Sequence, residues 1–309
     1  MNFQQLRIVR ETVRQRFNLT EVANALYTSQ PGVSKNIKDL EDELGVELFV
    51  RRGKRLIGLT KPGKELISTV ESILRDAQNL RSIADQFASR EQGNLIVATT
   101  HTQARYALPE VIKQFKARYP QVHLTLHQSS PREIADMLVA GEADIGIATE
   151  GLDSVPDLVT FPCYTWHHGI IVPQDHPLTR LPAGALSLAA LAAYPIVTYH
   201  AGFTGRSHID RAFADAGLKV DIVLSAIDAD VIKTYVEVGL GIGIVASMAF
   251  NPVKDAGLRL LNADALFEGN TTRLAVHRGT FLRDYARRFI TMLAPAVDDR
   301  VLQEALSGV

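Results

Sequence analysis

The chain has 309 residues, of which 46% are hydrophobic, and its formal net charge is −1. A chain of this length and apolar content is expected to form two or three domains with sizeable cores, which excludes a disordered or fibrous protein. Its single cysteine, Cys163, excludes an internal disulfide. We find neither a secretory leader nor an uninterrupted apolar run of about 18 residues, so we expect a cytoplasmic protein with no membrane association.

The charge is unevenly distributed along the chain. Residues 1–64 contain 12 basic and 7 acidic side chains, so the remainder is net acidic. A basic head joined to an acidic body is typical of a DNA-binding segment that carries a separate sensor.

Two short amphipathic helices joined by a few small polar residues are predicted between Thr20 and Phe49. Thr20 is a candidate N-cap of the first helix. Ser29 caps the second helix, Pro31 is its first helical residue, and Gly45 ends it. The apolar residues recur at helical spacing and fix the buried face: Val22, Ala23, Leu26, Val33, Ile37, Leu40 and Leu44. This pattern predicts a helix-turn-helix whose second helix enters a DNA major groove.

The start of the second helix carries the residues that we assign to base edges and phosphates: Gln30, Pro31, Ser34, Lys35 and Lys38. Acidic residues lie further along, at 39 and 41–43, where DNA would repel them, so we expect only the first two turns to enter the groove. The alternative is an ordinary helical hairpin with a solvated charged face. The short hinge, the proline start and the basic N-terminal half together favour DNA binding.

Residues 49–60 are predicted to form a two-stranded wing with Gly53 at its tip. The cations around the tip are Arg51, Arg52, Lys54 and Arg55. Such a run alone is more often a solvated loop. Beside a helix-turn-helix we expect Arg51 and Arg52 to contact phosphates or the minor groove.

From Thr60 to about Arg90 apolar residues keep helical spacing without a break, which predicts a helix of about thirty residues, or roughly 45 Å. Its apolar stripe is too long for one small domain to cover. We expect it to pair with the same helix of a second subunit in a homodimer, and the dimers to assemble into a homotetramer. Packing against the chain's own effector domain is the alternative.

After Gly93 short apolar strands alternate with helices. Strands are predicted at 94–99, 122–128 and 143–149, with helices at 105–119 and 131–140, the second of which has a capping box made by Ser130 and Glu133. This βαβαβ order is typical of a doubly wound α/β lobe. We expect the chain to cross into a second lobe around Pro162, with strands at 169–173, 194–199, 220–225 and 241–246 and helices at 186–193, 207–216 and 230–239. It should return through a strand at 272–277 and a helix at 281–293, which predicts a hinged cleft between two lobes.

Polar clusters follow the predicted strands at their carboxyl ends, where open α/β sheets bind ligands. These clusters contain Thr100, Thr102, Gln103, Thr149 and Thr204. Their hydroxyl, amide and backbone N–H groups suit a small zwitterion or oxyanion held by neutral donors. Each threonine alone is more easily explained as a helix cap, whereas clusters that converge across one cleft favour a ligand. Trp166 either lines this pocket or fills the lobe crossing.

The chain resembles the LysR-type transcriptional regulators. The resemblance is carried by Ala23, the run 28–34, Leu40–Glu41, Leu44–Gly45, Leu48–Phe49, Arg51 and Leu59–Thr60, and it then spans the whole chain. Within that family the effector half is similar to the CysB/Cbl group, regulators of sulfur assimilation, through segments 98–109, 147–150, 162–166, 202–207 and 228–235.

The resemblance implies an α/β protein with an N-terminal winged helix-turn-helix, a long linker helix and a two-lobed periplasmic-binding-protein-like effector domain. The expected domains are 1–60 for DNA binding, 61–91 for the linker and dimerisation helix, and 92–309 for the effector domain. Lobe I is expected at about 92–162 and 267–309, and lobe II at about 163–266.

The function implied by the resemblance is regulation of sulfur (cysteine or organosulfur) metabolism genes through promoter DNA. The implied effector is O-acetylserine or N-acetylserine, sulfate or a related anion, in a site formed by Thr100, Thr102, Gln103, Thr149 and Thr204. A LysR-type regulator of another pathway, or a small-molecule binding protein without DNA activity, remains the alternative.

An enzyme is the alternative from a different class. Gly239, Gly241 and Gly243 have the wrong spacing for a dinucleotide loop. Cys163 followed by the adjacent pair 167–168 of histidines is a poor set of metal ligands. We therefore expect no catalytic residues, no cofactor and no metal.

Overall fold

The computed structural model describes residues 1–88, 91–182 and 184–307. The chain forms two compact units, Met1–Asp85 and Gln86–Val309. Within the described residues, no helix is both long enough and apolar enough to cross a membrane. The end of the predicted linker helix at 89–90 lies outside the described residues.

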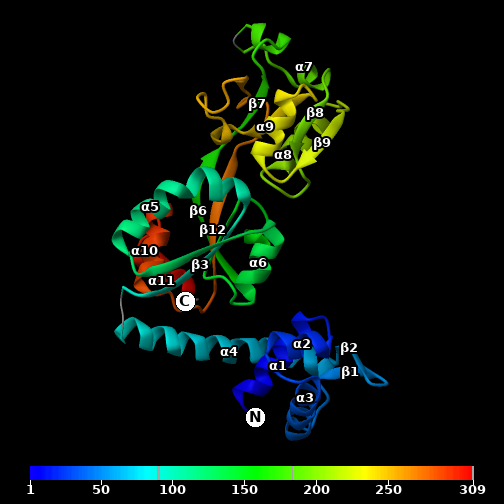
Figure 1. Cartoon of the computed structure of the whole chain (residues 1–309), viewed down its shortest axis with the longest axis vertical. Helices are drawn as coiled ribbons and strands as arrows, with labels where there is room; N and C mark the ends of the chain where they lie inside the picture. Colours follow the sequence, from blue (N-terminus) through cyan, green and yellow to red (C-terminus); the bar gives the residue numbers. More distant parts are fainter. Residues whose placement is uncertain (89–90, 183, 308–309) are drawn as a thin grey trace. The chain divides into compact units, whose positions relative to one another are not determined.

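The first unit is a helical head with a two-stranded wing (Figure 1). Its elements are α1 (Phe3–Arg14), α2 (Leu19–Ala25), α3 (Gln30–Leu44), β1 (Phe49–Arg52), β2 (Arg55–Leu59) and the start of α4 (Lys61–Ala88). The buried stripes of α2 and α3 meet in one core, which contains Val22, Val33, Ile37 and Leu40 together with Val70 and Leu74 of α4. The head therefore buries the first half of the α4 stripe.

Side-chain caps and one glycine set the limits of the head's helices. Ser29 caps α3 by accepting the backbone N–H of Gly32 at 3.3 Å, as predicted, and Gly45 ends the helix with φ +69°. The prediction that Thr20 caps α2 is wrong. Asn18 is the cap, because its Oδ1 accepts the N–H groups of Thr20 and Glu21, so Thr20 already lies in the first turn.

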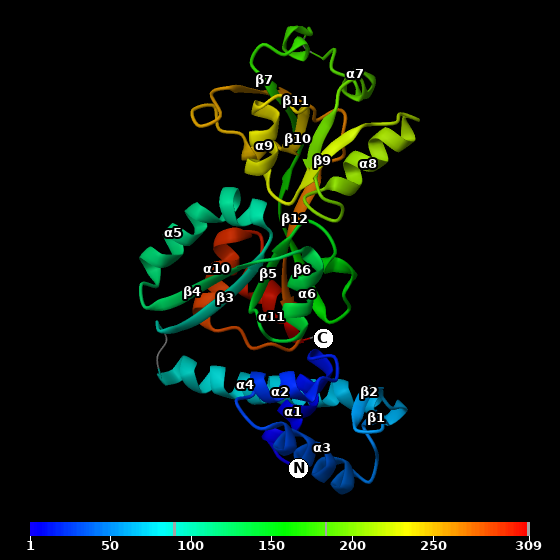
Figure 2. The same ribbon diagram turned by 45° about the vertical axis from the view of Figure 1, so that its right-hand side comes forward.

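The second unit contains two five-stranded sheets, which define two lobes (Figure 2). The sheet of the first lobe has the order β4-β3-β5-β12-β6, in which β3 pairs in parallel with β4 and β5, and β12 is antiparallel to both neighbours. Its strands are β3 (Gly93–Thr99), β4 (Val122–Gln128), β5 (Ile145–Ala148), β6 (Leu158–Trp166) and β12 (Asn270–His277). The parallel part agrees with the predicted βαβαβ order.

Helices cover both faces of this sheet. One core contains apolar residues of α5 (Leu108–Arg118), α10 (Asp284–Leu293) and α11 (Asp299–Ser307), and a separate core contains those of α6 (Pro131–Val139). A short π-helix at Gln103–Ala107 precedes α5 where the sequence predicted ordinary helix. The capping box of Ser130 and Glu133 at the start of α6 is confirmed.

The sheet of the second lobe has the order β11-β7-β10-β8-β9. Its strands are β7 (His168–Pro173), β8 (Ile196–Tyr199), β9 (Ile222–Ala226), β10 (Ile242–Ala246) and β11 (Leu258–Asn262). Residues of α7 (Leu188–Ala192) and α8 (Arg206–Asp215) belong to one core, and those of α9 (Ala229–Glu237) to another. Short 3-10 turns lie at Leu152–Ser154, Pro177–Arg180 and Ser247–Ala249.

The chain crosses between the lobes twice, after β6 and before β12. The sequence placed the first crossing around Pro162, but β6 remains paired with β12 as far as Trp166 and Asn270, so the chain leaves the first sheet at His167.

The helices α1 and α11 and the strands β6 and β11 were not predicted. Strands β6 and β11 mix exposed and half-buried positions with buried ones, whereas β5, β8 and β10 are buried at every position and stand out as apolar runs.

Candidate functional sites

The residues assigned to DNA lie on the surface of the head. Gln30, Pro31, Lys35 and Lys38 are exposed along the first turns of α3, and Ser34 is half-buried. The wing is the antiparallel hairpin β1–β2, with Arg52 exposed. The basic start of α3 therefore faces outward, as DNA contact requires.

Arg51 differs from its neighbours in the wing because its side chain, although 37% exposed, is ion-paired with a buried carboxylate of the head. Its Nη2 lies 2.6 Å from Oε2 of Glu41, whose side chain is only 7% exposed. The other carboxylate oxygen of Glu41 accepts the backbone N–H groups of Leu48 at 2.8 Å and Phe49 at 3.1 Å. Glu41 thus fastens α3 to the wing, although its position among acidic residues suggested a solvated side chain.

Tyr27, in the hinge between α2 and α3, was not singled out in the sequence. Its side chain is 98% exposed, and its backbone has φ +50°, a conformation that L residues rarely adopt. The aromatic ring of Tyr27 is therefore open to solvent close in sequence to the start of α3. Its signal in the sequence is an aromatic residue in a hinge of otherwise small side chains.

Four of the five polar residues predicted to bind the effector are buried in the second unit: Thr100, Thr102, Gln103 and Thr204. Thr102 and Gln103 follow β3 in the first lobe, and Thr204 precedes α8 in the second. The Oγ1 atoms of Thr102 and Thr204 are 3.4 Å apart, so the predicted clusters do meet between the lobes. Thr149 is half-buried and directly follows β5.

Gln103 has hydrogen-bonding capacity left over. The hydroxyl of Tyr164 donates to its Oε1, whereas its buried Nε2 has no partner in the described residues. Trp166 is also buried, and its Nε1 donates to Oγ1 of Thr272 at 3.1 Å, with its ring edge-on to His168 at 5.1 Å. Trp166 therefore packs at the lobe crossing, and its polar atom is already used.

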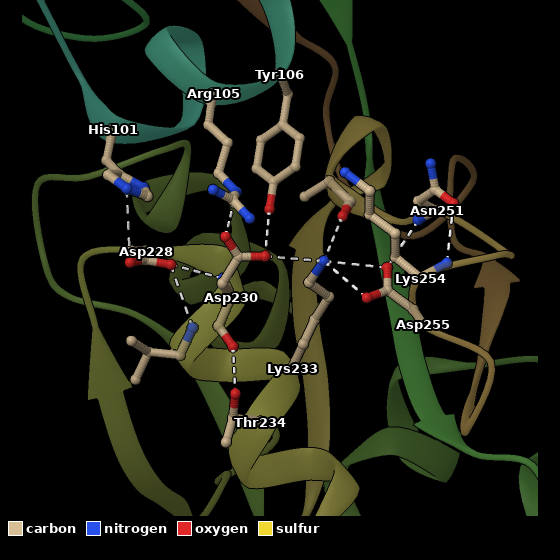
Figure 3. A network of polar contacts seen from close by, with 12 residues as sticks. His101, Arg105, Tyr106, Asp228, Asp230, Lys233, Thr234, Asn251, Lys254 and Asp255 are labelled. Atoms are coloured by element: carbon tan, nitrogen blue, oxygen red, sulfur yellow. Dashed lines mark hydrogen bonds and ion pairs between the residues drawn. The ribbon is translucent and has the colours of Figure 1, made fainter.

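A network of charged groups joins the two lobes beside this cluster (Figure 3). Asp230 of α9 accepts a hydrogen bond from the Tyr106 hydroxyl at 2.8 Å and is ion-paired with Arg105 and with Lys233. Lys233 is 9% exposed and also bonds Asp255 and the carbonyl of Ala249. Burial raises the pKa of Asp230, but the bonds from Tyr106 and Lys233 outweigh it and leave that pKa below its usual value.

The cap of α9 is Asp228, not Asp230. Its Oδ1 accepts the N–H groups of Asp230 at 2.6 Å and Val231 at 3.2 Å, and its other oxygen lies 3.7 Å from His101 of the first lobe. Two neighbouring carboxylates therefore have separate tasks: Asp228 caps the start of α9, and Asp230 binds the opposite lobe.

Cys163 shows no sign of reactivity. It is half-buried, and burial raises the pKa of its thiol to about 12, which keeps it protonated at neutral pH. The described residues contain no group of three or more metal-binding side chains.

Two family models match the chain. "Bacterial regulatory helix-turn-helix protein, lysR family" matches residues 3–64, and "LysR substrate binding domain" matches residues 88–298. The solved cofactor-binding domain of the Cbl transcriptional regulator is 48% identical, covers 71% of this chain and 95% of its own, and has a TM-score of 0.68. The fold and the two matched regions define a LysR-family transcriptional regulator with a DNA-binding head and an effector-binding domain.

The particular branch follows from full-length relatives. The regulator SsuR of Burkholderia cenocepacia is 62% identical over 97% of this chain and 96% of its own length. The regulator CysB of the same organism is 52% identical over 100% and 98%, and Cbl of Escherichia coli K12 is 55% identical over 94% and 92%. The chain belongs to the LysR family, among the relatives of CysB and Cbl.

Proposed function

We propose that this regulator controls genes of sulfur metabolism and that a small sulfur-pathway metabolite, bound between the two lobes of its effector domain, sets its activity. The single observation that carries the effector site is the buried polar cluster of Thr102, Gln103 and Thr204. Both lobes contribute to it, and the Nε2 of Gln103 has no partner in the part of the chain that the structure describes. Neutral donors in such a place suit a sulfate-like oxyanion or an acetylserine.

The division of labour follows the segments of the chain. The head, 1–60, binds promoter DNA through Gln30, Pro31, Ser34, Lys35, Lys38 and Arg52. Arg51 belongs to the same DNA-binding surface, and its ion pair with Glu41 holds it in place. The helix at 61–91 joins two subunits, and the domain at 92–309 binds the effector through Thr100, Thr102, Gln103, Thr149 and Thr204. The protein acts in the cytoplasm, where its promoter DNA is, and catalyses no reaction.

Exposed apolar residues on the second half of α4 support the dimer. Leu80, Ile83 and Phe87 are 69%, 40% and 79% exposed in the single chain, which is unusual for three large apolar residues at helical spacing. A second copy of the helix would cover them. Sedimentation equilibrium at micromolar concentration should give a dimer or tetramer, and a monomer would reject this part of the proposal.

The effector proposal is tested by fluorescence anisotropy of labelled promoter DNA, with O-acetylserine, N-acetylserine and sulfate added in turn. At least one metabolite should change DNA affinity or the footprint, because an effector acts through its different affinity for two conformations. If calorimetry detects binding of none of the three metabolites, the effector belongs to another pathway. Loss of DNA binding even at low salt would instead favour a small-molecule binding protein.

A further inference from the structure

Two side chains from distant segments, one half-buried and one buried, converge on Gly205, which lies at the start of α8. Glu150 follows β5, and its Oε1 accepts the backbone N–H of Gly205. Asn270, the first residue of β12, is 1% exposed, and a methyl group added at Gly205 would overlap its Oδ1. Gly205 has φ +70°, so a residue without a side chain satisfies both the backbone conformation and the close approach.

His168 fixes the orientation of Asn270. The Nε2 of His168 lies 2.9 Å from the carbonyl oxygen of Thr204, which can only accept, so Nε2 carries the proton. Burial lowers the pKa of His168 to about 4, so the ring is neutral and its Nδ1 is an acceptor. The Nδ2 of Asn270 donates to this Nδ1 at 3.3 Å, which turns Oδ1 toward Gly205.

Two acceptor oxygens are consequently buried beside Gly205 without a donor. Oε2 of Glu150 and Oδ1 of Asn270 have no hydrogen-bond partner in the described residues. A buried acceptor without a donor is unfavourable, so a donor brought to this place would be stabilised there. The burial that isolates Glu150 raises its pKa to about 7, with the N–H of Gly205 acting in the opposite direction.

We propose that Glu150 is a specificity residue of the effector cleft, which must hold a proton when an oxyanion lies beside Thr102 and Thr204. The inference rests on the proposed effector site. The proton comes from solvent and binds to the carboxylate, so that each oxyanion bound above neutral pH brings about one proton with it. Glu150 then changes from a repelling charge into a hydrogen-bond donor for the anion or for Asn270.

The position of Glu150 explains why its charge matters. Thr204 immediately precedes Gly205, and the backbone N–H of Gly205 donates to Glu150. An anion bound by Thr102 and Thr204 is therefore a neighbour of the Glu150 carboxylate. Two negative charges on neighbouring groups repel strongly where water is excluded. The neutral cleft residues cannot offset that repulsion.

Other charged groups near this helix start are accounted for. The Nε of Arg206 bonds Asp210 at 2.7 Å, and its Nη1 bonds the carbonyl of Tyr199, so its charge is paired. His208 lies 3.9 Å from Glu268 and is the other titratable group of α8 in this region. His168 stays neutral above pH 6 because of its burial and lowered pKa. Glu150 and His208 must therefore be separated experimentally.

The test is isothermal titration calorimetry of the full chain with sodium sulfate at pH 6 and pH 8. Imidazole and Tris serve as buffers, because sulfonate buffers carry a competing oxyanion. Wild-type affinity should fall about tenfold between pH 6 and pH 8, as expected for a group that titrates near 7 and must be protonated in the complex. Glu150→Gln should remove this dependence and bind sulfate about tenfold more tightly than wild type at pH 8.

Proton uptake gives a second readout that needs no variant. Heats measured in the two buffers should show about one proton taken up per sulfate bound by the wild type at pH 8, and none by Glu150→Gln. Asp153→Asn, an exposed carboxylate soon after Glu150, and His208→Gln should both keep the wild-type pH dependence.

Several results would overturn the inference. These are pH-independent sulfate binding by the wild type, an unchanged pH dependence in Glu150→Gln, or weaker binding by that variant at pH 8. If neither protein binds sulfate at either pH, the cleft is not an oxyanion site and the inference fails. Promoter binding and its response to acetylserines would then still be measured separately, so the wider proposal stands or falls by its own test.

Discussion

The hydroxyl of Tyr106 in the first lobe donates a 2.8 Å hydrogen bond to Oδ1 of Asp230 in the second. Asp230 is in turn 3.0 Å from Nζ of Lys233, which is fixed by Asp255 and by a backbone carbonyl. The bond from Tyr106 therefore ends on a carboxylate whose position is already set (Figure 3). Such a pair links the first lobe to the position of α9 in the second.

Removal of this hydroxyl should loosen the lobes without disturbing the core of either one. We expect Tyr106→Phe to lower the free energy of unfolding by about 1.5–3 kcal/mol, the usual range for a hydrogen bond to a charged group, measured by urea denaturation. Tyr235→Phe, a more exposed tyrosine on α9, is the matched control and should change it by less than about 0.5 kcal/mol. Equal effects of the two substitutions would argue against a bond between the lobes.

We expect Glu41 to stabilise the head through its buried contacts more than through the negative charge it adds to α3. Glu41→Gln replaces one carboxylate oxygen with an N–H₂ group, so either the buried N–H groups of Leu48 and Phe49 or the guanidinium of Arg51 loses an acceptor. We expect a loss of about 2–3 kcal/mol in unfolding free energy, followed by circular dichroism. Asp42→Asn, exposed on the same helix, should be nearly neutral; a similar loss there would mean that helix charge, not the buried contact, is responsible.

These residues show which parts of the molecule the sequence could predict. The Ser29 cap and the Gly45 stop depend on neighbours along the chain, and both were predicted correctly. The cap at Asn18 was missed because Thr20 is an equally good capping type, and only backbone geometry distinguishes them.

Contacts between distant segments could not be predicted from the local sequence patterns. Tyr106 and Asp230 are 124 residues apart, and nothing in either local pattern indicates that they meet. Glu41 lies in an acidic run that by itself reads as solvated. Its burial follows from the way the wing folds back on α3. The positions of polar residues at strand ends were predictable, whereas their individual partners required the fold.

Lys35 should contribute to promoter binding as a phosphate or base contact at the exposed start of α3. We expect Lys35→Ala to weaken binding by about 1–3 kcal/mol and to reduce the salt dependence of the affinity by about one ion, measured by fluorescence anisotropy across a salt series. Lys113→Ala, an exposed lysine on α5, should leave both quantities unchanged. An unchanged footprint and salt slope for Lys35→Ala would place the DNA elsewhere on the head.

Thr102 should influence the effector response while sparing DNA affinity. Its hydroxyl is fully buried and faces Thr204 across the lobes, far in sequence from the head. Thr102→Ala should shift the metabolite concentration needed for half-maximal response by about tenfold, the equivalent of one hydrogen bond of about 1.4 kcal/mol. Thr291→Ala, which removes a solvent-exposed hydrogen bond within α10, is the control. A normal response from Thr102→Ala would move the effector site away from the β3 end.

His168 should make the effector domain sensitive to acid. Burial lowers its pKa to about 4, below the ordinary value near 6.5, so the unfolded chain binds more protons than the folded one between these pH values. The contribution of His168 to stability is therefore complete above about pH 6.5 and falls by up to about 3 kcal/mol as the pH drops toward 4, whereas the raised pKa of Glu150 contributes in the opposite direction over a similar range. His168→Gln can still donate to the Thr204 carbonyl and accept from Asn270, but it does not titrate. Between pH 7 and pH 5 the urea midpoint of the wild type should therefore fall relative to that of His168→Gln, whereas His200→Gln, an exposed histidine, should change with pH as the wild type does. If His168→Gln loses as much stability on acidification as the wild type, then another buried group is responsible and the neutral ring does not anchor Asn270 in the way described above.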